Sequence, residues 1–345
     1  MITFRKLFLS VLGLFVLANI PFLSSVGASS VMWSQTYESG RFQAAFSLVE
    51  TSDGGYAIAG SSGFYQVEDF CLVKTDEYGN MQWIKTYGGP DSEEAYSLVQ
   101  TSDGGYAIAG DGLLVKTDEC GNMEWNQTYG GGSYFISNSL VETSDGGYVV
   151  AGGSRLVKFD SQGGIEWNQT YFMGATRSLV KTFDGGYAIA GDTDFSIPRN
   201  REIWLIKTDA YGDIEWKKAY EGETHEYARS LVATSEGGYA FVISSSFIKT
   251  DAQGNMEWNQ TYDVEMGIRQ PFSLIETSDG GYALAGYIWA AISGTTVFWA
   301  IKTDAQGIPE FPSWTILLIM MVTVVAVTVV YRRRLHKQNQ WRGDQ

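Results

Sequence analysis

An aspartate that recurs six times is the residue type in this chain most able to do chemistry. It follows a Lys-Thr or Lys-Phe pair and precedes a glycine-containing loop in every copy. A ring of six carboxylates would suit Ca²⁺, which prefers oxygen ligands. Aspartate also caps hairpin loops through backbone N–H groups, and we expect that role, with the preceding lysine paired to a neighbouring carboxylate. The six are Asp76, Asp118, Asp160, Asp209, Asp251 and Asp304.

Other catalytic groups are sparse. His225 is the one histidine before the C-terminal segment, so neither a multi-histidine metal site nor a repeated histidine acid–base pair can be built. The sequence has no Gly-x-Ser-x-Gly motif and no glycine-rich phosphate loop. We expect Cys71 to be a core residue, Cys120 to lie in a hairpin loop, and the two not to form a disulfide. The sequence therefore predicts a protein that is not an enzyme and carries no cofactor, with Ca²⁺ as the one ion to consider.

The elements that hold these residues also repeat. An Asp/Glu-Gly-Gly-Tyr turn occurs at six places, 39 to 52 residues apart, which is the period of propeller blades. Each turn follows a short apolar run that begins Ser-Leu, which reads as a strand, and leads into a second strand. A third strand carries the repeated lysine, and a fourth carries a tryptophan. The turns begin at Asp53, Asp103, Asp145, Asp184, Glu236 and Asp279.

Four strands in each unit predict an all-β, six-bladed β-propeller. Trp33 precedes any first strand, and no fourth strand follows Gly307. We therefore expect Met32 to Tyr37 to pair beside Phe298–Thr303 as the outer strand of the last blade, which would close the ring and remove an open edge.

The repeat resembles two known types. The motif Lys-Thr-Asp-x-x-Gly-Asn-x-x-Trp is similar to the docking motif of quinoprotein-type propellers, and the whole unit resembles the Asp-Gly-Gly-Tyr repeat of archaeal and bacterial surface proteins. The resemblance covers most of the chain and implies the fold. It implies no particular chemistry, because propellers carry many unrelated functions, and the cofactor-binding residues of quinoproteins have no counterparts here.

The two ends of the chain indicate export and anchoring. Arg5 and Lys6 precede an apolar run and small residues up to Ala28, which predicts a signal peptide over residues 1–28, with an uncleaved anchor helix as the alternative. Residues 29–308 form the predicted propeller and 309–313 a linker. Trp314–Tyr331 is long and apolar enough to span a bilayer. The basic tail, 332–345, is then cytoplasmic and the propeller extracellular.

Pro309-Glu310-Phe311, just before this span, resembles the Pro-Glu-Phe sorting signal of archaeal surface proteins, which implies a sorting transpeptidase as a partner. The chain carries 24 Lys+Arg against 39 Asp+Glu, for a net charge of −15. Such a charge repels nucleic acid, so no nucleic-acid partner is expected. The sequence thus predicts a single-pass cell-membrane protein.

Function is expected on one face of the ring. The connections between second and third strands are long at 61–69, 192–202 and 287–297, and long loops on a rigid frame commonly bind ligands. The leading hypothesis is a surface propeller that binds an extracellular protein or glycan, and the alternatives are a structural envelope protein or a carbohydrate-active or redox enzyme. The candidate ligand-binding residues are Arg41, Phe64, Tyr65, Glu93, Arg199, Arg201, His225, Arg269 and Trp289.

Three N-glycosylation sequons follow the fourth-strand tryptophan, where we expect the outer rim of the ring. Either they are modified, or the repeated strand sequence happens to spell the sequon. Their asparagines are Asn126, Asn168 and Asn259.

Overall fold

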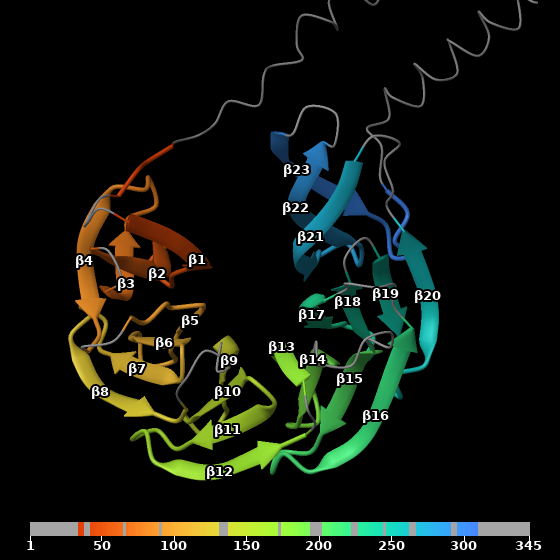
Figure 1. Cartoon of the computed structure of the whole chain (residues 1–345), viewed down its shortest axis with the longest axis horizontal. Coiled ribbons are helices and arrows are strands. Elements are labelled where there is room, and N and C mark those ends of the chain that lie inside the picture. The colour runs from red at the N-terminus through yellow and green to blue at the C-terminus, as the bar shows by residue number, and fades with distance from the viewer. Residues whose placement is uncertain are drawn as a thin grey trace, which may run out of the picture.

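The structure is a computed structural model of the whole chain. It describes residues 34–37, 42–64, 67–89, 92–130, 137–171, 174–193, 202–221, 227–243, 246–261, 267–290 and 295–309. Within these ranges all regular structure is β-strand, and the strands form six sheets arranged around a centre (Figure 1). The prediction of an all-β, six-bladed propeller is confirmed.

Each sheet is an antiparallel meander whose first strand lies innermost and whose last strand lies outermost. Blade 1 holds β1 (Phe42–Glu50), β2 (Tyr56–Phe64), β3 (Val67–Thr75) and β4 (Met81–Tyr87). Blade 2 holds β5 (Ser97–Gln100), β6 (Tyr106–Gly110), β7 (Leu113–Thr117) and β8 (Met123–Thr128). Blade 3 holds β9 (Ser137–Glu142), β10 (Tyr148–Gly152), β11 (Arg155–Phe159) and β12 (Ile165–Thr170).

The second half of the ring repeats the pattern, except that its last sheet is narrower. Blade 4 holds β13 (Gly174–Lys181), β14 (Tyr187–Thr193), β15 (Glu202–Thr208) and β16 (Ile214–Glu221). Blade 5 holds β17 (Ala228–Ala233), β18 (Tyr239–Ile243), β19 (Ser246–Thr250) and β20 (Met256–Thr261). Blade 6 holds three strands, β21 (Gly267–Glu276), β22 (Tyr282–Ala290) and β23 (Thr295–Thr303).

The repeated glycines make the tight turns possible. In the first turn Gly54 has a φ of 82°, a left-handed conformation that side chains disfavour. The Asp53 carboxylate accepts hydrogen bonds from Thr51 Oγ1 at 2.5 Å and from the backbone N–H of Gly55 at 3.1 Å. All six turns place a glycine at positive φ, namely Gly54, Gly104, Gly146, Gly185, Gly237 and Gly280.

The turns and connections divide the ring into two faces. The turns between the first and second strands and those between the third and fourth lie on one face, which we call the turn face. The connections between second and third strands, and those between blades, lie on the other, which we call the loop face.

The core of the protein is divided among the blade seams. Five apolar clusters each combine residues of two consecutive blades, from blades 1 and 2 to blades 5 and 6. At the centre of each is the leucine of the Ser-Leu motif, which is 3–4% exposed. Stacked sheets bury their faces on one another, so each blade needs two neighbours. These leucines are Leu98, Leu140, Leu179, Leu231 and Leu274.

The sixth seam, between blades 6 and 1, is open (Figure 1). Leu48 occupies the same repeat position as the five buried leucines but is 62% exposed. On the opposite side of the gap, Ile275 of β21 is 58% exposed. Among the described residues, the apolar faces that blades 6 and 1 turn toward each other do not pack together, whereas every other blade face packs against a neighbouring blade.

The predicted closing strand is absent from the described residues, which corrects the sequence-based expectation. Ser34 to Tyr37 form no strand, β23 pairs with β22 alone, and Trp33 lies outside the described residues. Tyr37 instead docks on blade 1, where its hydroxyl donates to the carbonyl of Gly79 at 2.8 Å. The place beside Thr303 is taken by Pro309, through an isolated bridge. The hairpin loop after β23 closes like the equivalent loops of the other blades, and it brings the chain back to the free edge of β23. Proline has no N–H, so Pro309 cannot extend the pairing along this edge.

None of the described residues forms a helix long and apolar enough to cross a membrane. The predicted signal peptide and the predicted span at Trp314–Tyr331 both lie outside the described residues, as do Glu310 and Phe311.

Candidate functional site

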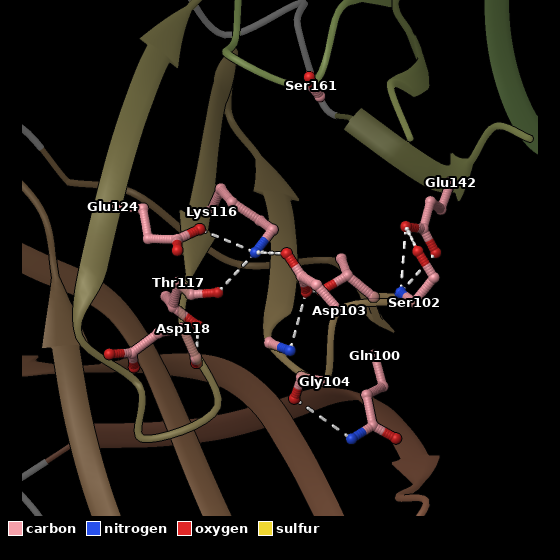
Figure 2. Close-up of polar contacts among 12 residues, drawn as sticks. Gln100, Ser102, Asp103, Gly104, Lys116, Thr117, Asp118, Glu124, Glu142 and Ser161 are labelled. Atoms are coloured by element: carbon pink, nitrogen blue, oxygen red, sulfur yellow. Dashed lines mark hydrogen bonds and ion pairs between the residues drawn. The ribbon is translucent and has the colours of Figure 1, made fainter. Parts of the chain in front are cut away.

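The repeated lysine of the third strand lies on the turn face in a cage of oxygen atoms. In blade 2, Lys116 forms ion pairs with Asp103 at 2.8 Å and Glu124 at 2.9 Å (Figure 2). Its Nζ also donates to the carbonyl of Thr117 at 2.8 Å. The lysine is buried, whereas both carboxylates are about half exposed. The expected pairing of this lysine with a neighbouring carboxylate is confirmed.

These contacts shift the titration of the turn aspartates. The hydrogen bond from Lys74, and next that from Thr51, lowers the pKa of Asp53 to about 2. For Asp184, burial raises the pKa, but hydrogen bonds from Lys207 and Thr182 outweigh it and bring the value to about 2. A carboxylate with a lowered pKa is charged across the physiological range, so this group is suited to an ion pair and not to proton transfer.

The second repeated aspartate caps its own hairpin loop. Asp118 Oδ1 accepts the backbone N–H of Cys120 at 2.9 Å and that of Asn122 at 2.7 Å. The same pair of bonds, to the residues two and four positions later, forms in all six copies. The capping prediction is confirmed. No group of three or more His, Cys, Asp or Glu within the described ranges is placed to hold a metal ion.

A cleft of about 430 Å³ lies between blades 2 and 3 on the turn face. Its lining includes Asp103, Lys116, Glu124 and Glu142. Glu142 accepts hydrogen bonds from the backbone N–H of Ser102 and from its hydroxyl, so it ties blade 3 to the turn of blade 2 (Figure 2). The charged groups of this cleft are thus used for contacts within the protein.

The equivalent cleft between blades 4 and 5 measures about 390 Å³. There Phe183 and Ala233 replace the Ser102 and Glu142 of the first cleft. The carboxylate–serine contact is therefore not a requirement of the repeat, whereas the lysine, its carboxylates and the tryptophan recur in both clefts.

On the loop face, two of the three expected long loops are largely strand, which corrects the sequence-based expectation. Strands β2 and β3 continue as a paired ribbon to Phe64 and Val67, and β22 and β23 continue to Ala290 and Thr295. In each ribbon the two strands satisfy each other's backbone N–H and C=O groups beyond the rest of the blade, so the chain stays extended there and does not form an irregular loop. The third expected loop runs from the end of β14 at Thr193 to the start of β15, and its interior lies outside the described residues.

The predicted ligand-binding residues fall into three groups. Glu93 is described in full, and its carboxylate accepts the N–H of Gly89, so it helps to shape its own connection. Phe64 and Trp289 lie on the two ribbons, where the structure places their backbone. Arg269 lies on β21, which pairs with β22 so that Arg269 is opposite Ile288, the neighbour of Trp289. The others lie outside the described residues, namely Arg41, Tyr65, Arg199, Arg201 and His225.

Sequence reasoning missed a charged pair in blade 4. Arg177 Nε lies 2.9 Å from the Asp192 carboxylate, which is 2% exposed. It also missed an acidic pair in blade 2, where the N–H of Glu94 donates to Asp111 at 2.8 Å and burial raises the pKa of Asp111. Asp111 has a φ of 35°, unusual for a residue with a side chain. The one feature of the sequence that could have indicated the first pair is the position of Arg177 directly before the repeated Ser-Leu pair.

The sequon asparagines and the cysteines lie where expected. Asn126, Asn168 and Asn259 are exposed on outermost strands β8, β12 and β20. Cys71 is buried in β3 and Cys120 is exposed in a hairpin loop, and the two do not form a disulfide.

Comparison with known proteins informs the fold alone. No protein-family description matches the chain, and no curated protein matches it. Among solved structures, Sqt1 from Chaetomium thermophilum is similar with a TM-score of 0.57 and 11% identity, over 79% of this chain and 72% of that one. The structure of the RRP9 WD40 repeats is similar with a TM-score of 0.55 and 11% identity, over 76% of this chain and 81% of that one.

A protein of unknown function from Bacteroides caccae gives a TM-score of 0.50 and 14% identity, over 74% of this chain and 94% of that one. Such identities show a shared propeller architecture and no shared chemistry. The architecture is compatible with a role in binding or recognition.

Proposed function

We propose that this protein is a cell-surface propeller that binds an extracellular protein or glycan through its loop face. One observation carries the proposal: the two faces of the ring use their polar groups differently. On the turn face the repeated lysines and aspartates bind each other and the backbone, as in the cage around Lys116. On the loop face two ribbons, ending at Phe64–Val67 and Ala290–Thr295, extend from the ring.

Variable extensions on a repetitive frame are the usual place for recognition. The turn face is nearly the same in every blade, so it offers six copies of one small surface. The loop face differs from blade to blade, because blades 1 and 6 extend their hairpins while the β10–β11 and β18–β19 hairpins are short. A ligand that contacts several blades can therefore be recognised with specificity on the loop face.

The anchoring part of the proposal rests on the sequence. The signal peptide over residues 1–28, the span at Trp314–Tyr331 and the basic tail together specify a single-pass membrane protein with an exterior propeller. The Pro309–Phe311 motif adds a sorting transpeptidase as a processing partner, and the exposed sequons add N-linked glycans on the outer rim.

The test is an array of glycans and surface proteins probed with residues 29–308. We expect a ligand whose binding is lost when the ribbon tips are shortened, with the strands reconnected at Gly63–Glu68 and Ile288–Val297. The matched control changes the turn face, for example Gln162→Ala and Gln253→Ala. Loss of binding in the control but not in the ribbon variants would reverse the assignment of faces. An array without any ligand would favour the alternative of a structural envelope protein.

A further inference from the structure

The innermost strands share an irregularity that faces the centre of the ring. In β1, β9, β13, β17 and β21 the register with the second strand shifts at the residue before the repeated serine. A β-bulge of this kind places two residues opposite one and turns a side chain away from the regular pleat. The bulged residues are Phe46, Asn138, Arg177, Arg229 and Phe272.

This position varies in type while the following Ser-Leu pair stays constant. In blades 2 and 3 the residue before the serine is Tyr96 and Asn138. Side chains at this position meet across the seams, because the rings of Phe46 and Tyr96 lie 5.1 Å apart and Arg229 lies 3.9 Å from the ring centre of Phe272. These variable positions therefore form a ring of residues on or beside the innermost strands, which surround the centre of the propeller (Figure 1).

Blades 4 and 5 place two arginines in this ring. Arg177 is held by Asp192, with Nε 2.9 Å from Oδ1 and Nη2 3.4 Å from Oδ2. Because Asp192 is almost fully buried, the arginine is fixed in one orientation. A guanidinium has five N–H donors in a planar fork. Two of the five are directed at Asp192, and the side chain is 24% exposed, so its outer edge can reach a ligand.

Aromatic rings cover the faces of both guanidinium groups. The ring centre of Tyr227 lies 5.1 Å from the Arg177 guanidinium carbon and 5.7 Å from that of Arg229. Phe272 stacks against Arg229 at 3.9 Å and is itself 44% exposed. A guanidinium stacked in this way presents its N–H edge, the geometry that recognises a planar carboxylate.

The distribution of arginine across the propeller points the same way. The arginines that the structure describes all lie in the loop-face half of their blades, three in first strands and one at the start of a third strand. The repeated lysines fall near the turn face. In a protein of net charge −15, this arrangement concentrates guanidinium groups around one mouth of the channel. These arginines are Arg155, Arg177, Arg229 and Arg269.

The geometry points to a binding site for a carboxylate-bearing saccharide at the loop-face mouth of the channel. Arg177 and Arg229 bind the carboxylate groups, and Phe272 offers an apolar surface to a sugar ring beside them. A saccharide fits better than a simple anion because charged donors and exposed aromatic surface occur side by side. This inference rests on the proposed function, because it names the ligand class of the same loop face.

The test uses the full-length chain in detergent and measures binding of an oligogalacturonate by calorimetry at low ionic strength. The neutral comparison is maltohexaose, which lacks carboxylates, and the acidic comparison is hexaglutamate. We expect binding of the oligogalacturonate that weakens with added salt, and no binding of maltohexaose. Hexaglutamate bound as tightly as the saccharide would overturn the ligand class, and no binding of the oligogalacturonate would overturn the site.

Variants locate the site. Arg229→Gln should weaken binding at least tenfold, and Arg229→Lys should restore only part of the loss, because an ammonium lacks the planar fork. The double variant Arg177→Gln with Asp192→Asn removes the second arginine without leaving a buried carboxylate unpaired. The matched control is Lys181→Gln, at the turn-face end of β13, which should bind as the parent does. Thermal unfolding of each variant reports whether the ring is intact.

The outcome for Arg229→Gln also separates this inference from the proposed function. An array ligand that still binds the folded Arg229→Gln variant but fails to bind the ribbon variants would refute the channel-mouth site and leave loop-face recognition standing. An oligogalacturonate that binds equally well to Arg229→Gln and to the parent would refute the site directly.

Discussion

The seam between blades 4 and 5 and the gap between blades 6 and 1 are built from the same repeat, yet one is packed and the other is open. Leu231 is 3% exposed in the first, whereas Leu48 is 62% exposed at the second. Lys207 of blade 4 is buried, whereas Lys302 of blade 6 is 38% exposed. The difference shows which parts of the repeat join one blade to the next.

The outermost strand adds specific contacts that join one blade to the next. In blade 4, Trp216 packs its ring 5.7 Å from Tyr239 of blade 5. The hydroxyl of Tyr220 donates to the carbonyl of Gly254 at 2.7 Å. Among the described residues the last blade has three strands and no outermost one, although Tyr37 of the N-terminal segment makes the equivalent hydrogen bond to Gly79 of blade 1. The repeated Asp–Gly–Trp motif is thus a clasp between blades: its aspartate shapes a turn whose glycine receives the tryptophan of the preceding blade.

The largest difference between the two regions should appear in leucine truncation. Leu231→Ala removes a side chain from a packed seam and should lower the free energy of unfolding by about 2–5 kcal/mol. Leu48→Ala removes a side chain that is already largely in water, and we expect about 0.5 kcal/mol or less. Urea denaturation of the purified chain measures both. Equal losses would mean that the sixth seam is packed in solution.

A smaller difference should appear among the turn glycines. A Cβ at Gly254 would lie 2.6 Å from the ring of Trp216, whereas a Cβ at Gly237 would meet nothing within 4 Å. Both glycines have a positive φ, so either change to alanine costs roughly 1–2 kcal/mol in backbone strain. Gly254→Ala should cost a further 1–3 kcal/mol or so from overpacking. If the two variants are equally stable by denaturation, the tryptophan does not press on this turn.

The repeat made the fold readable in advance, because every local signal occurred six times in register. The turn glycines, the capping aspartate Asp118 and the pairing of the repeated lysine with carboxylates all follow from local chemistry, so a single copy of the repeat was enough to predict them. The state of the sixth seam could not be predicted from the sequence, because two segments could pair with the same edge of β23. These are the N-terminal segment and the segment that ends at Pro309. The channel arginines escaped notice because a bulge breaks the alternation by which strand faces are assigned.

A still smaller difference in stability is expected for the hydrogen bonds that Tyr220 and Tyr37 donate to a glycine carbonyl of the next blade. Tyr220→Phe removes a buried hydrogen bond and should lower stability by about 0.5–1.5 kcal/mol. Tyr37→Phe removes the equivalent bond to Gly79, but its segment forms no strand, so the loss should be about 0.5 kcal/mol or less. The two losses are compared by thermal unfolding under one set of conditions. A loss at Tyr37 as large as that at Tyr220 would show that the N-terminal segment supports the ring as strongly as an outer strand does.

The smallest contrast concerns acid stability. Hydrogen bonds from Lys207 and Thr182, acting against burial, lower the pKa of Asp184 to about 2 in the folded protein. The carboxylate therefore stabilises the fold above its unfolded pKa of about 4, and this contribution is lost as the pH falls toward 2. Lys207→Met removes one of the hydrogen bonds that lower this pKa, so stability should fall less steeply between pH 4 and pH 2 than in the parent. Lys302→Met removes a solvent-screened pair with Asp279 and should change the slope less. Urea midpoints measured across this pH range test both variants, and an unchanged acid slope in Lys207→Met would show that the buried lysine does not couple the turn carboxylate to folding.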